Sequence, residues 1–325
     1  MEGSSSEKLI VVTREPDGIA TVTINRPKSL NSLTRPMMVD LAKAFKALAK
    51  DNSVRVIILS GAGRAFCSGV DLTGAQDVFK GDVKDPETDP VVQMEQCPKP
   101  IIGAINGLAI TAGLEIALAC DMLVAAKGAA FVDTHARFGI FPSWGLSQKL
   151  ARFIGPNKAR EVSLAALPLS AEEAEKLGFV NYVVDQNEVL NKARQLAGAI
   201  MKNSQDLVLR YKSVINDGYK LDLRQGLTME KMKVLAILNT ILIEDSLLKY
   251  LTVHLCSSSQ PAFCPCNLSL FDWLMIFYAD FPNLNSCSFL QERGHKYYDG
   301  MTPEQFKKMQ EFIARRSSKK PSSKL

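Results

Sequence analysis

Two turns rich in small residues, about forty positions apart, hold the residues of this chain that are best placed to do chemistry. The first runs from Gly61 to Asp71 after the apolar run 56–60, and the second runs from Gly107 to Glu115 after the apolar run 101–105. A strand, a small-residue turn and a helix leave backbone N–H groups unpaired at the helix start, where they can bind negative charge. If the two turns face each other, their amides form an oxyanion hole, which stabilises a developing anion.

Glu115 is the charged residue closest to this predicted anion site. It stands three residues after Ala112, so on a helix that begins there its carboxylate lies about one turn from the amides. Apolar surroundings would raise the pKa of a carboxyl group in this place, which suits general acid/base catalysis. The alternative is a glutamate that only offsets the dipole at a helix N-terminus.

The pair of turns resembles the signature of the crotonase, or enoyl-CoA hydratase, superfamily. The resemblance covers roughly Leu9 to Lys233 and resumes at Glu292. It implies an α/β fold, a crotonase-like spiral of β-β-α units with a helical C-terminal part. It also implies an acyl-CoA thioester substrate, no separate cofactor and no metal, since coenzyme A is part of the substrate, and assembly into a homotrimer or hexamer.

The catalytic residues of the family can be placed by matching its motifs. The oxyanion donors fall on the backbone N–H groups of Val70 and Ala112, and Glu115 matches the first catalytic glutamate of hydratases. The family usually has glycine where Ala112 stands, a change that matters only if the site needs a positive φ. The second catalytic glutamate aligns with His135, which could supply or relay a proton or be purely structural. Asp133 is a second, weaker candidate acid.

Three enzyme activities remain open with a histidine at this position. Hydration of a 2-enoyl thioester to a 3-hydroxyacyl thioester needs a base for water at C3 and a proton source at C2, which Glu115 and His135 would supply together. Glu115 alone would shuttle a proton between C2 and C4, as in an isomerase, and water attack on the thioester carbon would make a hydrolase. Hydratase is the leading prediction. The rivals from another class are an inactive isoform that acts as an assembly partner and an RNA-binding relative.

The resemblance also implies which residues hold the substrate. Lys28 and Arg64 are placed to meet the phosphates of coenzyme A. Carbonyl groups near Ala65 and Ser68 could accept from its adenine amino group, and Phe141 and Trp144 are predicted to line the acyl pocket. As isolated residues they would be ordinary solvated bases or core packing.

Charge and targeting signals limit the partners and the location. The formal net charge is +5, but seven Lys/Arg and one acid lie between residues 307 and 325, so the remainder is near neutral. This argues against a nucleic-acid surface. No apolar run reaches the ~18 residues of a membrane span, and the N-terminal residues do not read as a secretory signal. Ser323, Lys324 and Leu325 match an address read by the peroxisomal import receptor, which predicts the peroxisomal matrix.

Composition divides the chain into four parts: a spiral core over 1–200, a helical part over 201–233 and 292–316, an anomalous insert over 234–291, and a basic tail over 317–325. The insert carries four of the seven cysteines and five charged residues in 58, and shows no stable period. Its two ends can be encoded by the edge sequences of an intron. It also interrupts what would otherwise be one continuous charged helix. We interpret it as a translated, retained intron; the alternative is a genuine lineage-specific insertion or an interfacial hairpin.

Periodicity predicts the elements that must position the two turns. The pattern favours a hairpin over 9–14 and 19–24, and a helix over 37–49 with Thr34 as its cap. Ser170 opens a capping box. Further strands are predicted over 54–60, 101–106, 122–126 and 130–132. Further helices are predicted from about 112, and over 171–177, 187–202, 204–216, 221–233 and 303–315.

Overall fold

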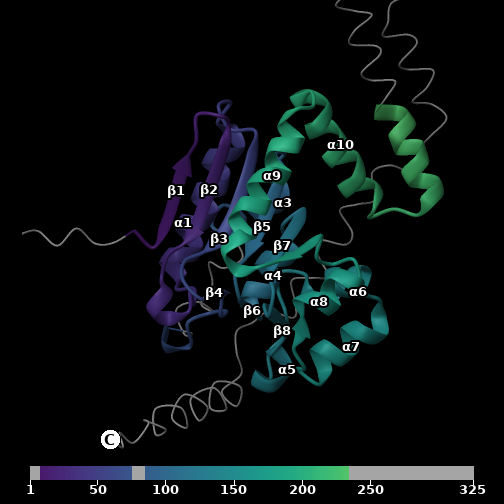
Figure 1. The fold of residues 1–325 in the computed structure, drawn as a ribbon. Coiled ribbons are helices and arrows are strands. Elements are labelled where there is room, and N and C mark those ends of the chain that lie inside the picture. Colours follow the sequence, from purple (N-terminus) through teal and green to yellow (C-terminus); the bar gives the residue numbers. More distant parts are fainter. Residues whose placement is uncertain (1–7, 75–84, 234–325) are drawn as a thin grey trace, which may run out of the picture. The chain divides into compact units, whose positions relative to one another are not determined.

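The strands form two sheets, and from β3 to β8 successive strands alternate between them (Figure 1). The larger sheet has six strands in the order β1 (Ile10–Arg14), β2 (Ile19–Ile24), β3 (Val56–Gly61), β5 (Ile101–Ile105), β7 (Met122–Ala126) and β10 (Tyr182–Val184). The smaller sheet has the order β4 (Ala65–Cys67), β6 (Leu108–Ile110), β8 (Ala130–Val132) and β9 (Leu169–Ser170). β1 pairs antiparallel with β2, and β8 with β9, while the other pairs are parallel.

These arrangements come from a computed structural model, which describes residues 8–74 and 85–233. The described residues fall into two compact units, which divide between Ile215 and Asn216. Of the second unit, residues 216–233 are described; they include a helix over 223–233, whose Lys233 pairs with Asp217 at 3.0 Å. The insert, the helix over 303–315 and the tail lie outside the described residues, so the predicted division of the chain stays a prediction.

The order of elements repeats along the first unit. β3, β5 and β7 of the larger sheet are followed by β4, β6 and β8 of the smaller one, and a helix follows each pair. These helices are α3 (Pro90–Gln96), α4 (Ala112–Leu118) and α5 (His135–Phe138). The predicted α/β spiral of β-β-α units is therefore confirmed.

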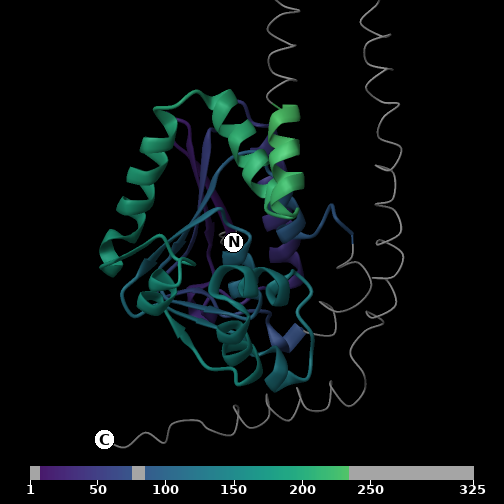
Figure 2. The ribbon, with the colours of Figure 1, turned by 90° about the vertical axis from the view of Figure 1, so that its right-hand side faces the viewer.

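Helices cover both faces of the larger sheet (Figures 1 and 2). α9 (Val189–Met201) lies against β3, β5 and β7, while α1 (Arg35–Lys50) packs against α3 and β1 on the other face. Every residue of β3 is buried, as expected for a parallel strand covered on both faces, which reads as a continuous apolar run. The core is therefore built around the same strand that leads into the first small-residue turn.

Four more α-helices lie among residues 146–218. α6 (Leu146–Ile154) packs on α4 and on α7 (Pro156–Leu164), and α8 (Ala171–Lys176) packs on β9 and β10. α10 (Gln205–Gly218) buries none of its residues, although Lys212 pairs with Asp121 at 2.7 Å.

Most predicted elements are present, but the helices α3, α6 and α7 were not predicted. The hairpin and the helix after Thr34 are confirmed, as are the strands over 122–126 and 130–132 with the same limits. The Ser170 hydroxyl accepts a hydrogen bond from the Glu173 amide at 3.1 Å, as a capping box requires. β4 and β6 were not predicted, because three-residue strands within the two turns are too short to show a period.

Gly113 tests how closely α4 must approach β4. A Cβ atom at this position would lie 2.2 Å from the carbonyl oxygen of Cys67, so Gly113→Ala should lower the free energy of unfolding by about 1–3 kcal/mol or more through overpacking. Gly198 in α9 is a matched control, since a Cβ there meets nothing within 4 Å. Gly198→Ala should be neutral or stabilising by up to about 1 kcal/mol. Urea unfolding of both variants measures the difference, and equal midpoints would contradict the predicted contact.

Candidate active site

The first turn presents the amide of Val70. Val70 forms a parallel bridge with Leu33, in which the Leu33 amide donates to the Gly69 carbonyl and the Asp71 amide donates to the Leu33 carbonyl, both at 2.8 Å. Because these bonds flank Val70, its own N–H points to the opposite side of the bridge. Gly69 has a φ of +97°, which favours glycine.

The second turn lies directly against the first. A Cβ atom on Gly69 would lie 3.0 Å from the carbonyl oxygen of Ile110 and 3.9 Å from the amide nitrogen of Ala112. Ala112 is the first residue of α4, so the helix offers no acceptor to its N–H. The two amides predicted to bind an oxyanion are therefore brought to neighbouring positions by Gly69 and the start of α4.

The backbone strain of the second turn falls on Thr111 and not on Ala112. Thr111 has φ 53° and ψ −107°, a conformation that costs a β-branched residue on the order of 1–3 kcal/mol. Its amide donates to the Val132 carbonyl at 2.7 Å, and its hydroxyl shares a hydrogen bond with that of Thr134. Ala112 does not have a positive φ. An alanine where the family usually has glycine therefore introduces no such strain.

Glu115 is carried into the interior by the first turn of α4. Its side chain is buried, with 2% of the residue exposed. The carboxylate Oε1 accepts a hydrogen bond from the Trp144 amide at 2.8 Å. Burial raises the pKa of Glu115 above its ordinary value, although the nearby His135 and the amide hydrogen bonds act in the opposite direction. The group is therefore closer to protonation at neutral pH than an exposed glutamate.

The structure brings His135 next to Glu115. His135 is the first residue of α5, and its ring Nε2 lies 3.8 Å from Glu115 Oε2. The other ring nitrogen, Nδ1, lies 2.7 Å from Oδ1 of Asp133, and the His135 amide donates to the same oxygen at 3.0 Å. Burial alone would raise the pKa of Asp133, but the hydrogen bonds from the His135 ring and amide and from Ser163 lower it on balance. All three predicted proton-handling groups are thus neighbours.

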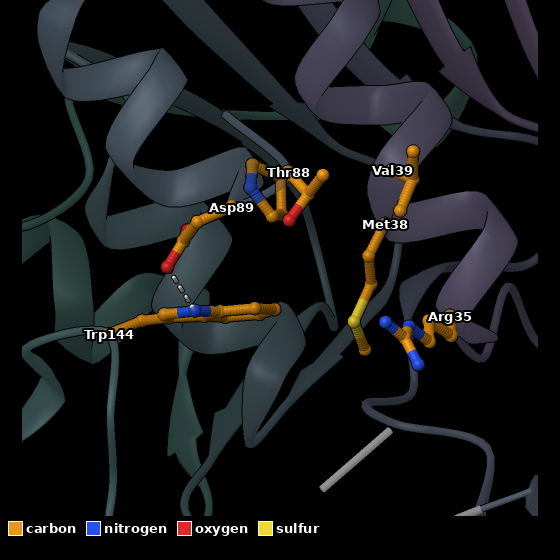
Figure 3. Close-up of a pocket in the computed structure, with 7 residues that line it drawn as sticks. Arg35, Met38, Val39, Thr88, Asp89 and Trp144 are labelled. Carbon is orange, nitrogen blue, oxygen red and sulfur yellow. Dashed lines mark hydrogen bonds between the residues drawn. The ribbon is translucent and has the colours of Figure 1, made fainter. Parts of the chain in front are cut away.

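Trp144 joins this cluster to a pocket. The pocket is lined by Arg35, Met38, Val39, Thr88, Asp89, Pro90 and Trp144. Figure 3 shows Trp144 and Asp89 on one side of it, with Met38 and Arg35 of α1 on the other. The indole N–H of Trp144 donates to Asp89 at 3.1 Å, while its backbone amide holds Glu115. Trp144 therefore lies between the buried carboxylate and the pocket, and its place in an acyl pocket stays a prediction.

Phe141 has a different environment. It is 81% exposed in the single chain, so no enclosed pocket surrounds it within the described residues. Phe141 is exposed because it lies in the loop before α6, although its side chain is apolar. Its role at the acyl chain remains a prediction.

The residues predicted to bind coenzyme A differ in their accessibility. Lys28 and Arg64 are both exposed, which leaves their charges available to phosphates. Ala65 is buried in β4, and its carbonyl accepts from the Asn31 side chain at 2.7 Å. An adenine amino group would have to share that oxygen. Ser68 is half-buried, and its amide donates to Leu30 at 3.0 Å.

Three polar residues that the sequence analysis did not assign hold these segments together. Asn31 is fully buried, accepts from the Arg26 amide at 2.9 Å and donates to the carbonyl groups of Ala62 and Ala65. Arg26 also forms an ion pair with Asp71, directly after Val70. The segment predicted to bind coenzyme A is thereby fixed to the first turn. An asparagine in the polar, turn-forming segment after Pro27 was the available signal.

Two negative findings concern only part of the chain. Within residues 8–74 and 85–233, no group of three or more His, Cys, Asp or Glu side chains is placed to hold a metal ion. In those same ranges, no helix combines the length and apolarity needed to cross a lipid bilayer.

Comparison with known proteins decides the family. The model of the enoyl-CoA hydratase/isomerase family matches residues 14–253, more than half of the chain. The chain belongs to this family. It is 59% identical over 325 residues to a protein of Arabidopsis thaliana named probable enoyl-CoA hydratase 1, peroxisomal, with all of both chains covered. It is also 36% identical to a probable mitochondrial enoyl-CoA hydratase of Dictyostelium discoideum, over 67% of this chain and 79% of that protein.

A solved structure of the family has the same fold. The enoyl-CoA hydratase from Bacillus anthracis superposes with a TM-score of 0.65 at 33% identity, covering 69% of this chain and 89% of that one. Membership of the enoyl-CoA hydratase/isomerase family confirms the resemblance carried by the two turns.

Removing the charge of Glu115 should change stability in a pH-dependent way. Because burial raises its pKa in the folded state, the folded protein binds more protons than the unfolded chain above the ordinary value of 4.5. The contribution of Glu115 to stability therefore falls as pH rises from 4.5 to the folded pKa, and Glu115→Gln lacks this pH-dependent contribution. We expect the variant to gain stability relative to the wild type across this window.

Chemical unfolding between pH 4 and 8 measures this difference. Glu175→Gln is the matched control, because that exposed carboxylate also accepts from a backbone amide, Val183 N, at 2.9 Å. Equal pH dependence for Glu115→Gln and wild type would contradict the buried, charge-disfavouring environment.

Proposed function

We propose that this protein hydrates 2-enoyl-CoA to 3-hydroxyacyl-CoA, as a step of fatty-acid β-oxidation in the peroxisome. The observation that carries the proposal is the pairing of Glu115 Oε2 with His135 Nε2, 3.8 Å apart in the buried site beside the two turns. Hydration needs a base and an acid on one face of the substrate, and this pair supplies two groups. Membership of the enoyl-CoA hydratase/isomerase family and the likeness to an Arabidopsis relative named as a hydratase support it.

The reaction follows from the placement of the groups. The thioester oxygen of the substrate lies between the amides of Val70 and Ala112, which stabilise the enolate as it forms. Glu115 accepts a proton from water, and the resulting hydroxyl bonds to C3. The protonated ring of His135 gives its Nε2 proton to C2, so that one water has been added. The proton on Glu115 then returns to His135, once their atoms approach from 3.8 Å to hydrogen-bond distance.

The same pairing separates hydration from isomerisation. A double-bond isomerase needs one group that moves a proton between C2 and C4. Two facing groups that can hold a proton, with both side chains buried, favour the addition of water. We therefore place isomerase activity second.

Substrate binding and assembly complete the proposal. Lys28 and Arg64 contact the phosphates of coenzyme A, and the acyl chain passes Trp144 toward the pocket beside Asp89. We also infer a homotrimer or hexamer. α10 supports it, since Leu207, Tyr211 and Ile215 are exposed at a spacing of four residues and therefore share one helix face. An apolar stripe of this kind is typical of a face covered by another chain.

Product analysis with 2-enoyl-CoA and 3-enoyl-CoA tests the activity. We expect 3-hydroxyacyl-CoA from the 2-enoyl substrate. Glu115→Gln should lower kcat by roughly 10²–10⁴-fold because it removes the base, and His135→Ala should slow hydration because it removes the proton donor. Glu175→Gln, on the exposed carboxylate of α8, should retain wild-type activity. Full hydration by His135→Ala would show that the proton donor is assigned wrongly, and conversion of only the 3-enoyl substrate would favour isomerase.

Peroxisomal import should depend on Ser323, Lys324 and Leu325. The relative from Arabidopsis is named peroxisomal, and the tripeptide matches a receptor-read address. A fluorescent protein fused before residue 1 should enter peroxisomes in plant cells, and deletion of the three residues should leave it in the cytosol. Deletion of residues 317–322 is the control, because it removes basic residues but keeps the tripeptide. Import without the tripeptide would disprove the signal.

A further inference from the structure

Asp133 and His135 form a turn in which one carboxylate oxygen has two donors. Asp133 follows β8, and its Oδ1 accepts from the His135 amide at 3.0 Å and lies 2.7 Å from the ring Nδ1. Both residues are buried, with 2% and 6% of their surfaces exposed. The amide contact is an Asx-turn, which orders the backbone at the start of α5. The contact with the ring is additional and is not needed for the turn.

The ring contact fixes which nitrogen does chemistry. A carboxylate oxygen only accepts, so Nδ1 must carry a proton to bond with it. Nε2 is then the nitrogen that gains and loses a proton, and it is the one that faces Glu115 Oε2. The charged groups that face the ring are Glu115 from α4 and Asp133 from its own turn, while Ser163 of α7 contributes a hydrogen bond to Asp133.

We propose that Asp133 is a positioning residue for catalysis, whose carboxylate holds His135 with Nε2 toward Glu115 and stabilises the imidazolium that donates to C2. This inference rests on the proposed hydration. The negative charge of Asp133 offsets the positive ring while Glu115 is occupied with the proton of water. Without that charge the buried imidazolium would have one fewer partner and would form less readily.

Replacing Asp133 by asparagine tests the role of the charge separately from the role of the turn. In Asp133→Asn the side-chain oxygen can still accept from the His135 amide, so the start of α5 is retained while the charge is lost. The matched control is Asp17→Asn, because Asp17 Oδ1 accepts from the Ile19 amide two residues later, at 3.2 Å, in the hairpin between β1 and β2. The two variants make the same chemical change in the same type of turn.

Steady-state hydration of 2-enoyl-CoA is measured from pH 5 to 10. We expect Asp133→Asn to lower kcat by roughly 10- to 100-fold with little change in KM, as for the loss of a partner that orients a proton-transfer group. The alkaline limb of the kcat profile should move to lower pH, because the protonated ring has lost its neighbouring negative charge. Asp17→Asn should match the wild type.

Nitrogen-15 NMR of the imidazole rings gives a readout independent of turnover. The chain has three histidines, and His135→Ala assigns the signals of His135 by their disappearance. In the wild type at a pH where the ring is neutral, we expect the proton on Nδ1. A proton on Nε2 would overturn the inference, whatever the activity.

The outcomes distinguish this inference from the proposed function. A wild type that hydrates 2-enoyl-CoA, with an Asp133→Asn variant that equals Asp17→Asn in kcat and pH profile, would overturn the role of Asp133 alone. A wild type that forms no 3-hydroxyacyl-CoA would overturn the proposed function, and the NMR measurement would then decide whether Asp133 sets the ring tautomer.

Discussion

The site depends on the contact between the first turn of α4 and the end of β4. Gly113 lies so close to the Cys67 carbonyl that no side chain fits between them, and Gly69, with a φ of +97°, lies against the Ile110 carbonyl. Close approach of backbone to backbone is the use of glycine that no other residue can replace. It places the N-terminus of α4 beside the Val70 loop, and Glu115 one turn along the helix follows automatically. A larger separation would leave each turn an ordinary connection.

The same contact explains why polar groups are buried here. Burying a carboxylate is unfavourable unless it is hydrogen-bonded or paired, and Glu115 has the Trp144 amide and the nearby His135 ring. Asp133 is bonded in turn to His135. The network is not neutralised into a simple ion pair, because burial still raises the pKa of Glu115. A raised pKa brings a carboxylate closer to the range in which it can both accept and return a proton.

Local signals in the sequence were sufficient for the two turns, for Glu115 and for the capping box at Ser170. They also predicted that His135 would lie near Glu115, through the resemblance to a family motif. Contacts between distant segments gave no such signal. The bond from the Trp144 amide to Glu115 spans 29 residues, and the exposure of Phe141 depends on the path of a loop. The turn formed by Asp133 and His135 was visible as an aspartate two residues before a histidine, yet this spacing is common and has meaning only once both side chains are known to be buried.

A histidine at the position where the resemblance places a second glutamate gives the site a different charge balance. Two carboxylates that face each other repel, and one of them must be held protonated to act as an acid. A carboxylate and an imidazole attract, so the proton is shared without that repulsion, but the buried ring then needs its own counter-charge when Glu115 becomes protonated. Asp133, two residues before the ring, reaches both the amide and Nδ1 of His135 with its short side chain. The histidine and the aspartate therefore make sense as a pair: an imidazole without Asp133 would lack orientation, and a glutamate in place of His135 would meet a second negative charge.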